Sequence, residues 1–217
     1  MSIFIRMINS KWNLFRSLGR EKQVVESPEW RKPHDIVRNV LKYIHKGKAL
    51  DIGAQYGDNS LFLAQNGFRV LATDIDGQRL GDLRRYASEA GLNLRVNTAV
   101  QDVTQGIDGM HDVIVATRTL NYLPREQALA VVENMKAHTS RGGLNVIGAV
   151  TKYGDFGKYP NSKYSKFLVD HDELKSFYDD WEILEYEEKE ERFQMTLENV
   201  DVNVVASIIA RKPLTQG

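Results

Sequence analysis

The feature that most constrains the fold is a regular alternation of apolar segments with segments of helical periodicity between residues 49 and 150. Apolar runs bounded by turn residues predict five strands, at 49–53, 68–74, 94–99, 112–117 and 144–150. Helices are predicted between them at 58–66, 77–90 and 125–137. This alternation requires a parallel sheet with helices on both faces. The sequence therefore predicts a single Rossmann-like α/β domain.

The flanking segments extend this plan. Helical spacing recurs at 33–43 and at 170–178. The segment 151–169 has no clear period and predicts a mobile loop or lid, whose aromatic residues are Tyr153, Phe156, Tyr159, Tyr164 and Phe167. Two more strands, at 181–186 and 202–210, are joined by a charged segment, and the second is expected to insert antiparallel to its neighbours. The expected sheet has seven strands, mostly parallel, with an antiparallel last strand.

Charge and composition exclude several classes of protein. Twenty-nine basic residues balance 29 acidic residues, so no overall field attracts the chain to a polyanion, and we expect no nucleic-acid partner. The absence of cysteine excludes disulfides, thiolate metal sites and a cysteine nucleophile, and no metal is predicted. No apolar run reaches the roughly 20 residues that span a bilayer, so no transmembrane segment is predicted. The expected location is the cytoplasm.

Residues 1–34 are predicted to form an extension that precedes a domain at 35–217. Its first twenty residues combine Arg6, Lys11, Arg16 and Arg20 with apolar side chains, as in a basic amphipathic helix. One interpretation is a transit peptide or weak contact with a membrane surface through residues 1–20. The other, which we prefer, is a surface helix that packs on the domain or a lid that covers its ligand cleft.

The stretch from Asp51 to Gly57 follows the first predicted strand and leads into the next helix. Ligands of open parallel sheets bind beyond the carboxyl ends of the strands. Gly53 and Gly57 let the backbone approach a ligand closely, and the free amide groups of the helix start face the same space. Asp74 ends the second strand, where a carboxylate can accept both ribose hydroxyls of an adenosine. The alternative is a tight turn that only connects strand and helix.

These residues resemble the first motif of the class I S-adenosylmethionine-dependent methyltransferases, Asp/Glu-x-Gly-x-Gly-x-Gly. The chain matches it at Asp51, Gly53 and Gly57, with Gln55 in place of the middle glycine. We interpret Gln55 as a variant cofactor contact; the alternative is that it crowds the methionine portion. The resemblance also implies that Asp102 contacts the adenine amino group, unless it only forms a turn. The residues expected to bind S-adenosylmethionine are Asp51, Gly53, Ala54, Gln55, Gly57, Asn59, Asp74, Ile75, Asp102, Val103 and Thr117.

A narrower resemblance, to the tellurite-resistance methyltransferases, covers about residues 49–212. It rests mainly on scaffold residues, in the stretches 59–67, 141–147, 167–174, 178–182 and 206–212. The resemblance implies a small-molecule methyl acceptor, with a metalloid oxyanion or a soft nucleophile as the suggested chemistry.

Catalytic candidates follow from the needs of methyl transfer. Displacement at a sulfonium is in line, so alignment and desolvation can supply much of the acceleration. Arg118 and Tyr122 follow the fourth strand, where this fold brings cofactor and acceptor together; Arg118 holds an anionic acceptor or forms a plain ion pair. If the acceptor must lose a proton, the candidate bases are His171, which we prefer, and His34, or a tyrosine of the lid. Ordinary structural roles stay open for all of them.

Two other functions stay open. An NAD(P)-dependent Rossmann oxidoreductase would share the architecture and the strand-end acid. It predicts a Gly-x-Gly-x-x-Gly turn and a parallel continuation beyond the fifth strand, and the sequence indicates neither. A non-catalytic S-adenosylmethionine-binding protein would result if Gln55 reshaped the cofactor site.

Overall fold

The computed structural model describes residues 32–159, 162, 165–194 and 200–214. The strands are β1 (Gly47–Ile52), β2 (Phe68–Asp74), β3 (Val96–Val100), β4 (His111–Thr117), β5 (Thr139–Gly154), β6 (Glu182–Gln194) and β7 (Val200–Arg211). The α-helices are α2 (Asp35–Asn39), α3 (Asp58–Gln65), α4 (Gly77–Glu89), α5 (Arg125–Ala137), α6 (Asp155–Lys158) and α7 (Glu173–Ser176). Three 3₁₀ turns are η1 (Val40–Lys42), η2 (Val103–Gln105) and η3 (Leu120–Tyr122).

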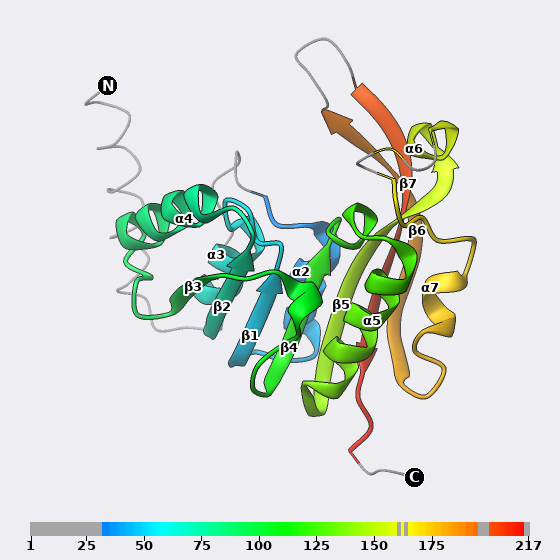
Figure 1. Ribbon diagram of the computed structural model, residues 1–217. Helices are drawn as coiled ribbons and strands as arrows, with labels where there is room; N and C mark the ends of the chain where they lie inside the picture. The colour runs from blue at the N-terminus through cyan, green and yellow to red at the C-terminus, as the bar shows by residue number, and fades with distance from the viewer. Residues whose placement is uncertain (1–31, 160–161, 163–164, 195–199, 215–217) are drawn as a thin grey trace.

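All seven strands form one sheet with the order β3-β2-β1-β4-β5-β7-β6 (Figure 1). The first five strands pair in parallel, and β7 lies antiparallel between β5 and β6. The Rossmann-like α/β fold and the inserted antiparallel strand are therefore confirmed. The strand order reverses between β1 and β4, so the ligand crevice of such a sheet is expected at the carboxyl ends of these two strands.

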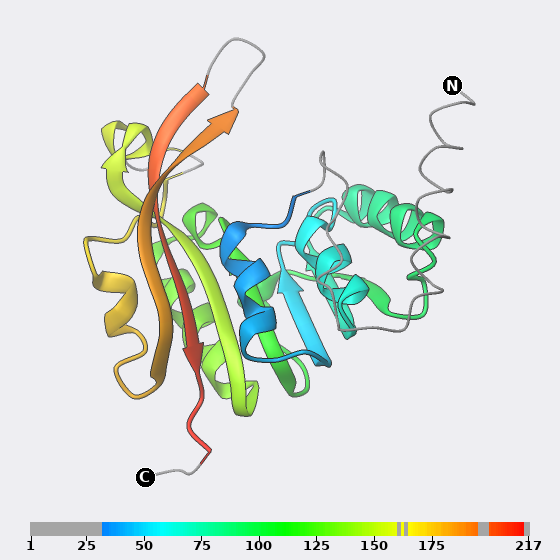
Figure 2. The same cartoon turned by 180° about the vertical axis from the view of Figure 1, so that it is seen from behind.

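Helices cover both faces of the sheet (Figures 1 and 2). Val113 and Val115 of β4 pack into a core with α2, α3 and α4, whereas Ile114 and Ala116 pack into a second core with α5 and α7. Successive side chains of a strand point to opposite faces, so a strand buried on both faces must be apolar throughout. This is why the central strands were recognisable as continuous apolar runs.

The last third departs from the predicted elements. The charged segment expected between two short strands is mostly strand, because β6 and β7 pair from Glu182 opposite Arg211 to Gln194 opposite Val200. The helix expected at 170–178 is confined to α7, and the one expected at 33–43 is α2 followed by η1. Pairing with β7 overrides the weak strand propensity of the glutamates in β6.

The predicted lid at 151–169 is largely secondary structure where it is described. β5 continues to Gly154, α6 follows, and Thr151 forms a parallel bridge with Val169. Phe156 and Phe167 are buried in the cores, while Tyr153 and Tyr159 are exposed; Tyr164 lies outside the described residues. Burial of two aromatic rings fixes a segment that has no periodicity in the sequence.

The extension predicted at 1–34 lies outside the described residues except for its last three positions. Its role as a lid or as a membrane-surface helix stays a prediction. Within the described part of the chain, no helix is both long enough and apolar enough to span a membrane.

Candidate functional site

The turn after β1 has left-handed backbone at three positions: Gly53 (φ 68°), Gln55 (φ 50°) and Gly57 (φ 86°). A methyl group at Gly53 would lie 2.4 Å from the Thr119 hydroxyl, and one at Gly57 would lie 2.1 Å from a methyl group of Leu83. Both glycines are therefore required by packing as well as by conformation. The Gln55 side chain is exposed, so it does not fill the interior of the turn.

Asp74 ends β2 beside this turn and is 8% exposed. Its Oδ2 accepts a 2.8 Å hydrogen bond from the Gln55 amide, and its Oδ1 accepts one of 2.9 Å from the Asp76 amide. An ionised carboxylate offers about four lone-pair positions, so Asp74 keeps the capacity to accept two hydroxyl groups. The next residue, Ile75, is 76% exposed and adds an apolar surface at the same edge. A carboxylate beside an apolar surface fits a ribose linked to an aromatic base.

Asp51, the first residue of the motif, lies in β1 just before the turn. Its side chain is fully buried in β1, where Ser60 of α3 donates a 2.5 Å hydrogen bond to its Oδ2. Burial raises the pKa of Asp51 to about 7, against the opposing hydrogen bonds of Ser60 and Asn59. Asp51 thus ties α3 to β1 and can hold the helix start in place, while Ala54, also buried, continues the turn.

Asp102 and Val103 lie where β3 leads into η2. The Asp102 side chain is exposed, and its Oδ1 accepts from both the hydroxyl and the amide of Thr104, which lower the pKa of Asp102. The Gln101 amide donates to the Asp74 carbonyl at 3.0 Å and so holds this corner against β2. The turn-forming role is therefore present, and a contact with adenine stays a prediction.

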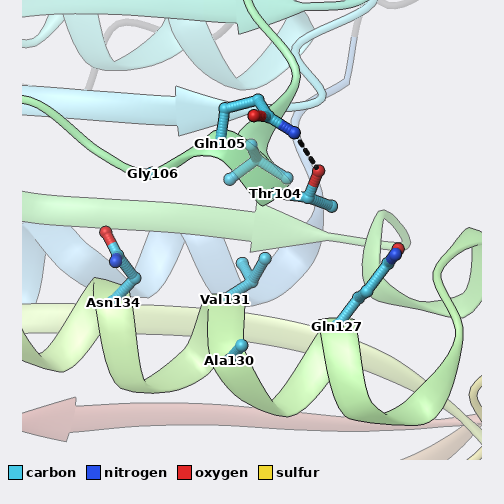
Figure 3. A pocket seen from close by; sticks show the side chains of 8 residues that line it. Thr104, Gln105, Gly106, Gln127, Ala130, Val131 and Asn134 are labelled. Carbon is cyan, nitrogen blue, oxygen red and sulfur yellow. Dashed lines mark hydrogen bonds between the residues drawn. The ribbon is translucent and has the colours of Figure 1, made fainter.

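A small pocket opens between η2 and α5 (Figure 3). It is lined by Val103, Thr104, Gln105, Gly106, Gln127, Ala130, Val131 and Asn134. Gln127, Ala130, Val131 and Asn134 extend along α5, and Gln105 donates to the Thr104 hydroxyl on the opposite wall (Figure 3). The lining has no charged side chain, and its polar side chains are amides and one hydroxyl.

A second group of side chains gathers where β4 ends, beside Gly148 in the middle of β5. Asn59 of α3 donates to the Thr117 hydroxyl at 3.0 Å, and its Oδ1 accepts from the His34 amide at 3.0 Å. The His34 ring lies against β5, because a methyl group at Gly148 would meet it at 3.5 Å. Asn59 and Thr117 thus connect the predicted cofactor turn with His34.

Arg118 and Glu191 complete this group. Arg118 has left-handed backbone (φ 52°) held by its amide, which donates to the Gly148 carbonyl at 2.7 Å. Its guanidinium lies 5.2 Å from the centre of the Phe193 ring. Glu191 Oε1 lies 2.9 Å from His34 Nε2. Burial by itself would raise the pKa of Glu191, but His34 and Arg118 more than offset this effect and hold it below its ordinary value.

The sequence reasoning missed Glu191, Phe193 and Thr119. Glu191 lies in a run of charges beyond the predicted end of its strand at residue 186. Residues 187–192 are all charged, so no alternation of apolar and polar side chains indicated that the strand continues.

His171 is not brought together with the other catalytic candidates. It is 67% exposed, and its Nδ1 lies 2.7 Å from Glu188, which raises the pKa of His171. Glu188 faces α7, whereas the neighbouring Lys189 contacts Asp35 of α2, and side chains alternate between the faces of a strand. His171 and His34 therefore lie on opposite faces of β6. Tyr122 lies in η3 and is 43% exposed.

The sheet order, the glycine turn and the strand-end carboxylate together define the class: this is the fold of S-adenosylmethionine-dependent methyltransferases. The N-methyltransferase NodS from Bradyrhizobium japonicum, solved in complex with S-adenosyl-L-homocysteine, shares the fold at 17% identity, with a TM-score of 0.66 over 94% of this chain and 99% of that chain.

Residues 21–205 match the family model described as tellurite resistance protein TehB, and the chain belongs to this family. A Haemophilus influenzae relative named "Probable S-adenosyl-L-methionine-dependent methyltransferase TehB" is 34% identical over 167 residues, which are 76% of this chain and 57% of the relative. The crystal structure of TehB from Haemophilus influenzae superposes with a TM-score of 0.73 at 33% identity, covering 83% of this chain and 62% of that chain. The chain thus spans little more than half the length of that curated relative. The resemblance to the tellurite-resistance methyltransferases is confirmed.

Proposed function

We propose that this chain is an S-adenosylmethionine-dependent methyltransferase that acts on a small-molecule acceptor by direct in-line transfer. The observation that carries the proposal is the edge formed by the glycine turn and Asp74, in a chain of the TehB family. Asp74 is held by two backbone amides and keeps capacity for the ribose hydroxyls of the cofactor.

The other predicted cofactor residues have distinct roles in this proposal. Ile75 packs against the adenine ring, and Asp102 and Val103, which follow β3, contact the adenine from the other side. Gly53 and Gly57 keep the turn open to close approach, and Asn59 with Thr117 borders the methionine portion. When bound, S-adenosylmethionine supplies an electrophilic methyl group on a positively charged sulfur.

The chain's own residues align and desolvate the reactants. Arg118 and Tyr122 border the space beyond β4 where the acceptor is expected. Asp51, buried and bonded to Ser60, stiffens the junction of β1 and α3, where the predicted cofactor turn begins. Positioning of this kind can contribute roughly 7–11 kcal/mol to lowering a barrier.

The alternatives fit less well. An oxidoreductase would continue the sheet in parallel beyond β5, whereas β7 is antiparallel there. A closed, non-catalytic site would require Gln55 to fill the turn, and its side chain is exposed instead. The cytoplasm stays the proposed location.

Calorimetry with S-adenosylmethionine and S-adenosylhomocysteine tests the proposal. We expect both to bind, and S-adenosylhomocysteine to form when the protein is incubated with S-adenosylmethionine and a panel of small thiols, amines and metalloid oxyanions. Absence of binding at millimolar ligand would refute the proposal. Binding without turnover of any acceptor would favour the non-catalytic alternative, and binding of NAD(P) alone would favour the oxidoreductase.

A further inference from the structure

The pair formed by His34 and Glu191 lies at the edge of the sheet where methyl transfer is proposed, although 157 residues separate its members. His34 precedes α2, and its side chain is 6% exposed. Glu191 reaches it from β6, with 25% of its side chain exposed. Gly148 of β5 lies against the imidazole, while Asn59 accepts from the backbone amide of His34 and is itself bonded to Thr117.

Both imidazole nitrogens of His34 are buried, and neither meets the geometry of a hydrogen bond with a described residue. Nε2 lies 2.9 Å from Glu191 Oε1, within ion-pair distance, whereas no described residue forms a hydrogen bond or an ion pair with Nδ1. A carboxylate that accepts from one ring nitrogen selects the tautomer whose other nitrogen carries a lone pair. Buried polar atoms are normally hydrogen-bonded, so an unpartnered Nδ1 beside a proposed reaction site suggests a partner that arrives with the substrate.

The surrounding charges are balanced. The positive charge of Arg118, which follows β4, helps to lower the pKa of Glu191. Lys189 lies 3.4 Å from Asp35, the residue that follows His34. The groups that face the pair from the elements packed around it are therefore Arg118, Asp35 and Lys189. The Glu191 carboxylate beside His34 would repel an oxyanion, so this edge is better suited to an acceptor that carries a proton.

We propose that His34 and Glu191 form the acceptor side of the methyl-transfer site, with His34 taking the proton from the acceptor and Glu191 positioning the imidazole. This inference rests on the proposed function and names its substrate class, a small nucleophile that bears a proton, such as an amine, a hydroxyl or a thiol. As the bond between nucleophile and hydrogen breaks, the proton passes to Nδ1. The nucleophile's electron pair forms the bond to the methyl carbon, and the electrons of the old carbon–sulfur bond return to sulfur.

Sinefungin tests this placement without any acceptor. This cofactor analogue carries a primary amine where S-adenosylmethionine carries the transferred methyl group, and such an amine is protonated at neutral pH. The Glu191 carboxylate attracts the positive charge of this ammonium group across the imidazole ring, and S-adenosylhomocysteine, which lacks the charge, gains no such attraction. We expect calorimetry to show tighter binding of sinefungin than of S-adenosylhomocysteine, and Glu191→Gln to reduce this ratio by about threefold or more.

Glu188→Gln is the matched control, because Glu188 also pairs with a histidine but faces the other side of β6. It should leave the ratio unchanged, and both variants should bind S-adenosylhomocysteine within about twofold of the wild type. If Glu191→Gln does not fold, Glu191→Asp can replace it. The shorter side chain keeps the charge but moves it away from His34, so the ratio of sinefungin to S-adenosylhomocysteine affinity should fall by a smaller amount. In His34→Gln, the pKa of Glu191, measured by carboxyl carbon NMR, should rise.

An unchanged ratio in the Glu191 variant, or an equal loss in Glu188→Gln, would overturn the inference. If the wild type binds neither ligand, the proposed function itself fails. If it binds both and the ratio is insensitive to Glu191, only the acceptor assignment fails.

Discussion

The proposed ligand edge has two halves, a cofactor half at the ends of β1 and β2 and an acceptor half at the end of β4, and they are assembled in different ways. At the ends of β1 and β2, the turn from Gly53 to Gly57 and the Asp74 carboxylate belong to one stretch of about 22 residues, joined by the hydrogen bond from the Gln55 amide. At the end of β4, beside the middle of β5, the residues His34, Arg118 and Glu191 come from three distant segments. The first half depends on local backbone conformation, and the second depends on how the whole sheet is assembled.

This difference suggests that the two halves can be disabled separately. The cofactor half is held by backbone amides, which a side-chain substitution elsewhere does not remove. The acceptor half is held by side-chain contacts between His34 and Glu191 and by Arg118 stacked over Phe193. Asn59 is the link between them, because it contacts both His34 and Thr117.

The largest expected effect is that of His34→Gln on methyl transfer. Loss of the proton acceptor should lower kcat by about 100-fold or more, measured with the best methyl acceptor of the panel. The affinity for the cofactor should stay within about twofold of the wild-type value. His171→Gln decides between the two histidines, and His45→Gln, at an exposed position before β1, is the control. Loss of activity in His171→Gln with an active His34→Gln would return the assignment to His171.

The Asp74→Asn substitution should act on the cofactor half alone. Removing the charge weakens hydrogen bonds to the ribose and to two backbone amides, and we expect about 10- to 100-fold weaker binding of S-adenosylhomocysteine by calorimetry. The pKa of Glu191 should not change. If that pKa shifts, or if cofactor affinity is retained, the two halves are not independent in the way described.

Asp51→Asn should change the pH dependence of stability. Because burial raises the pKa of Asp51 from 3.8 to about 7, the native state binds this proton more tightly than the unfolded state. The stabilisation that protonated Asp51 gives the folded state is fully present below the unfolded-state pKa of 3.8 and is lost as the pH rises through about 7. The wild type should lose about 4 kcal/mol of unfolding free energy between these two pH values, since the pKa difference is about 3 and each unit corresponds to about 1.4 kcal/mol, and the variant should lack this loss. Urea unfolding measures it, with Asp82→Asn at the surface of α4 as control.

The smallest effect is expected for Gln55→Gly. The φ of 50° is unfavourable for a side chain and costs on the order of 1 kcal/mol, which glycine relieves while losing about as much in unfolded-state entropy. Stability should change by less than about 1 kcal/mol, and cofactor affinity by less than about threefold. Disappearance of cofactor binding in this variant would show that Gln55 contacts the cofactor.

Gly57→Ala, by contrast, places a methyl group 2.1 Å from Leu83 and should strongly lower the free energy of unfolding, measured by urea unfolding.

Much of the fold was predictable because local patterns carry it. Continuous apolar runs such as 113–116 are required by burial on two faces, and the alternation with helices determines a parallel sheet. The same locality made the cofactor turn readable, since its glycines and Asp74 have fixed places relative to their strands. The predicted lid could not be corrected from sequence, because Phe156 and Phe167 are fixed by burial in cores that the sequence does not display.

By itself, then, the sequence determined the Rossmann-like sheet, its inserted antiparallel strand and the location of the proposed cofactor turn, because these follow from short-range periodicity and backbone conformation. Only the tertiary structure decided that β6 continues to Gln194, that Glu191 faces His34, and that His171 lies on the opposite face. Strand length and facing depend on pairing with β7, a partner that is distant in the chain. The contact between residues 34 and 191 depends on this pairing and on the docking of α2 against the sheet.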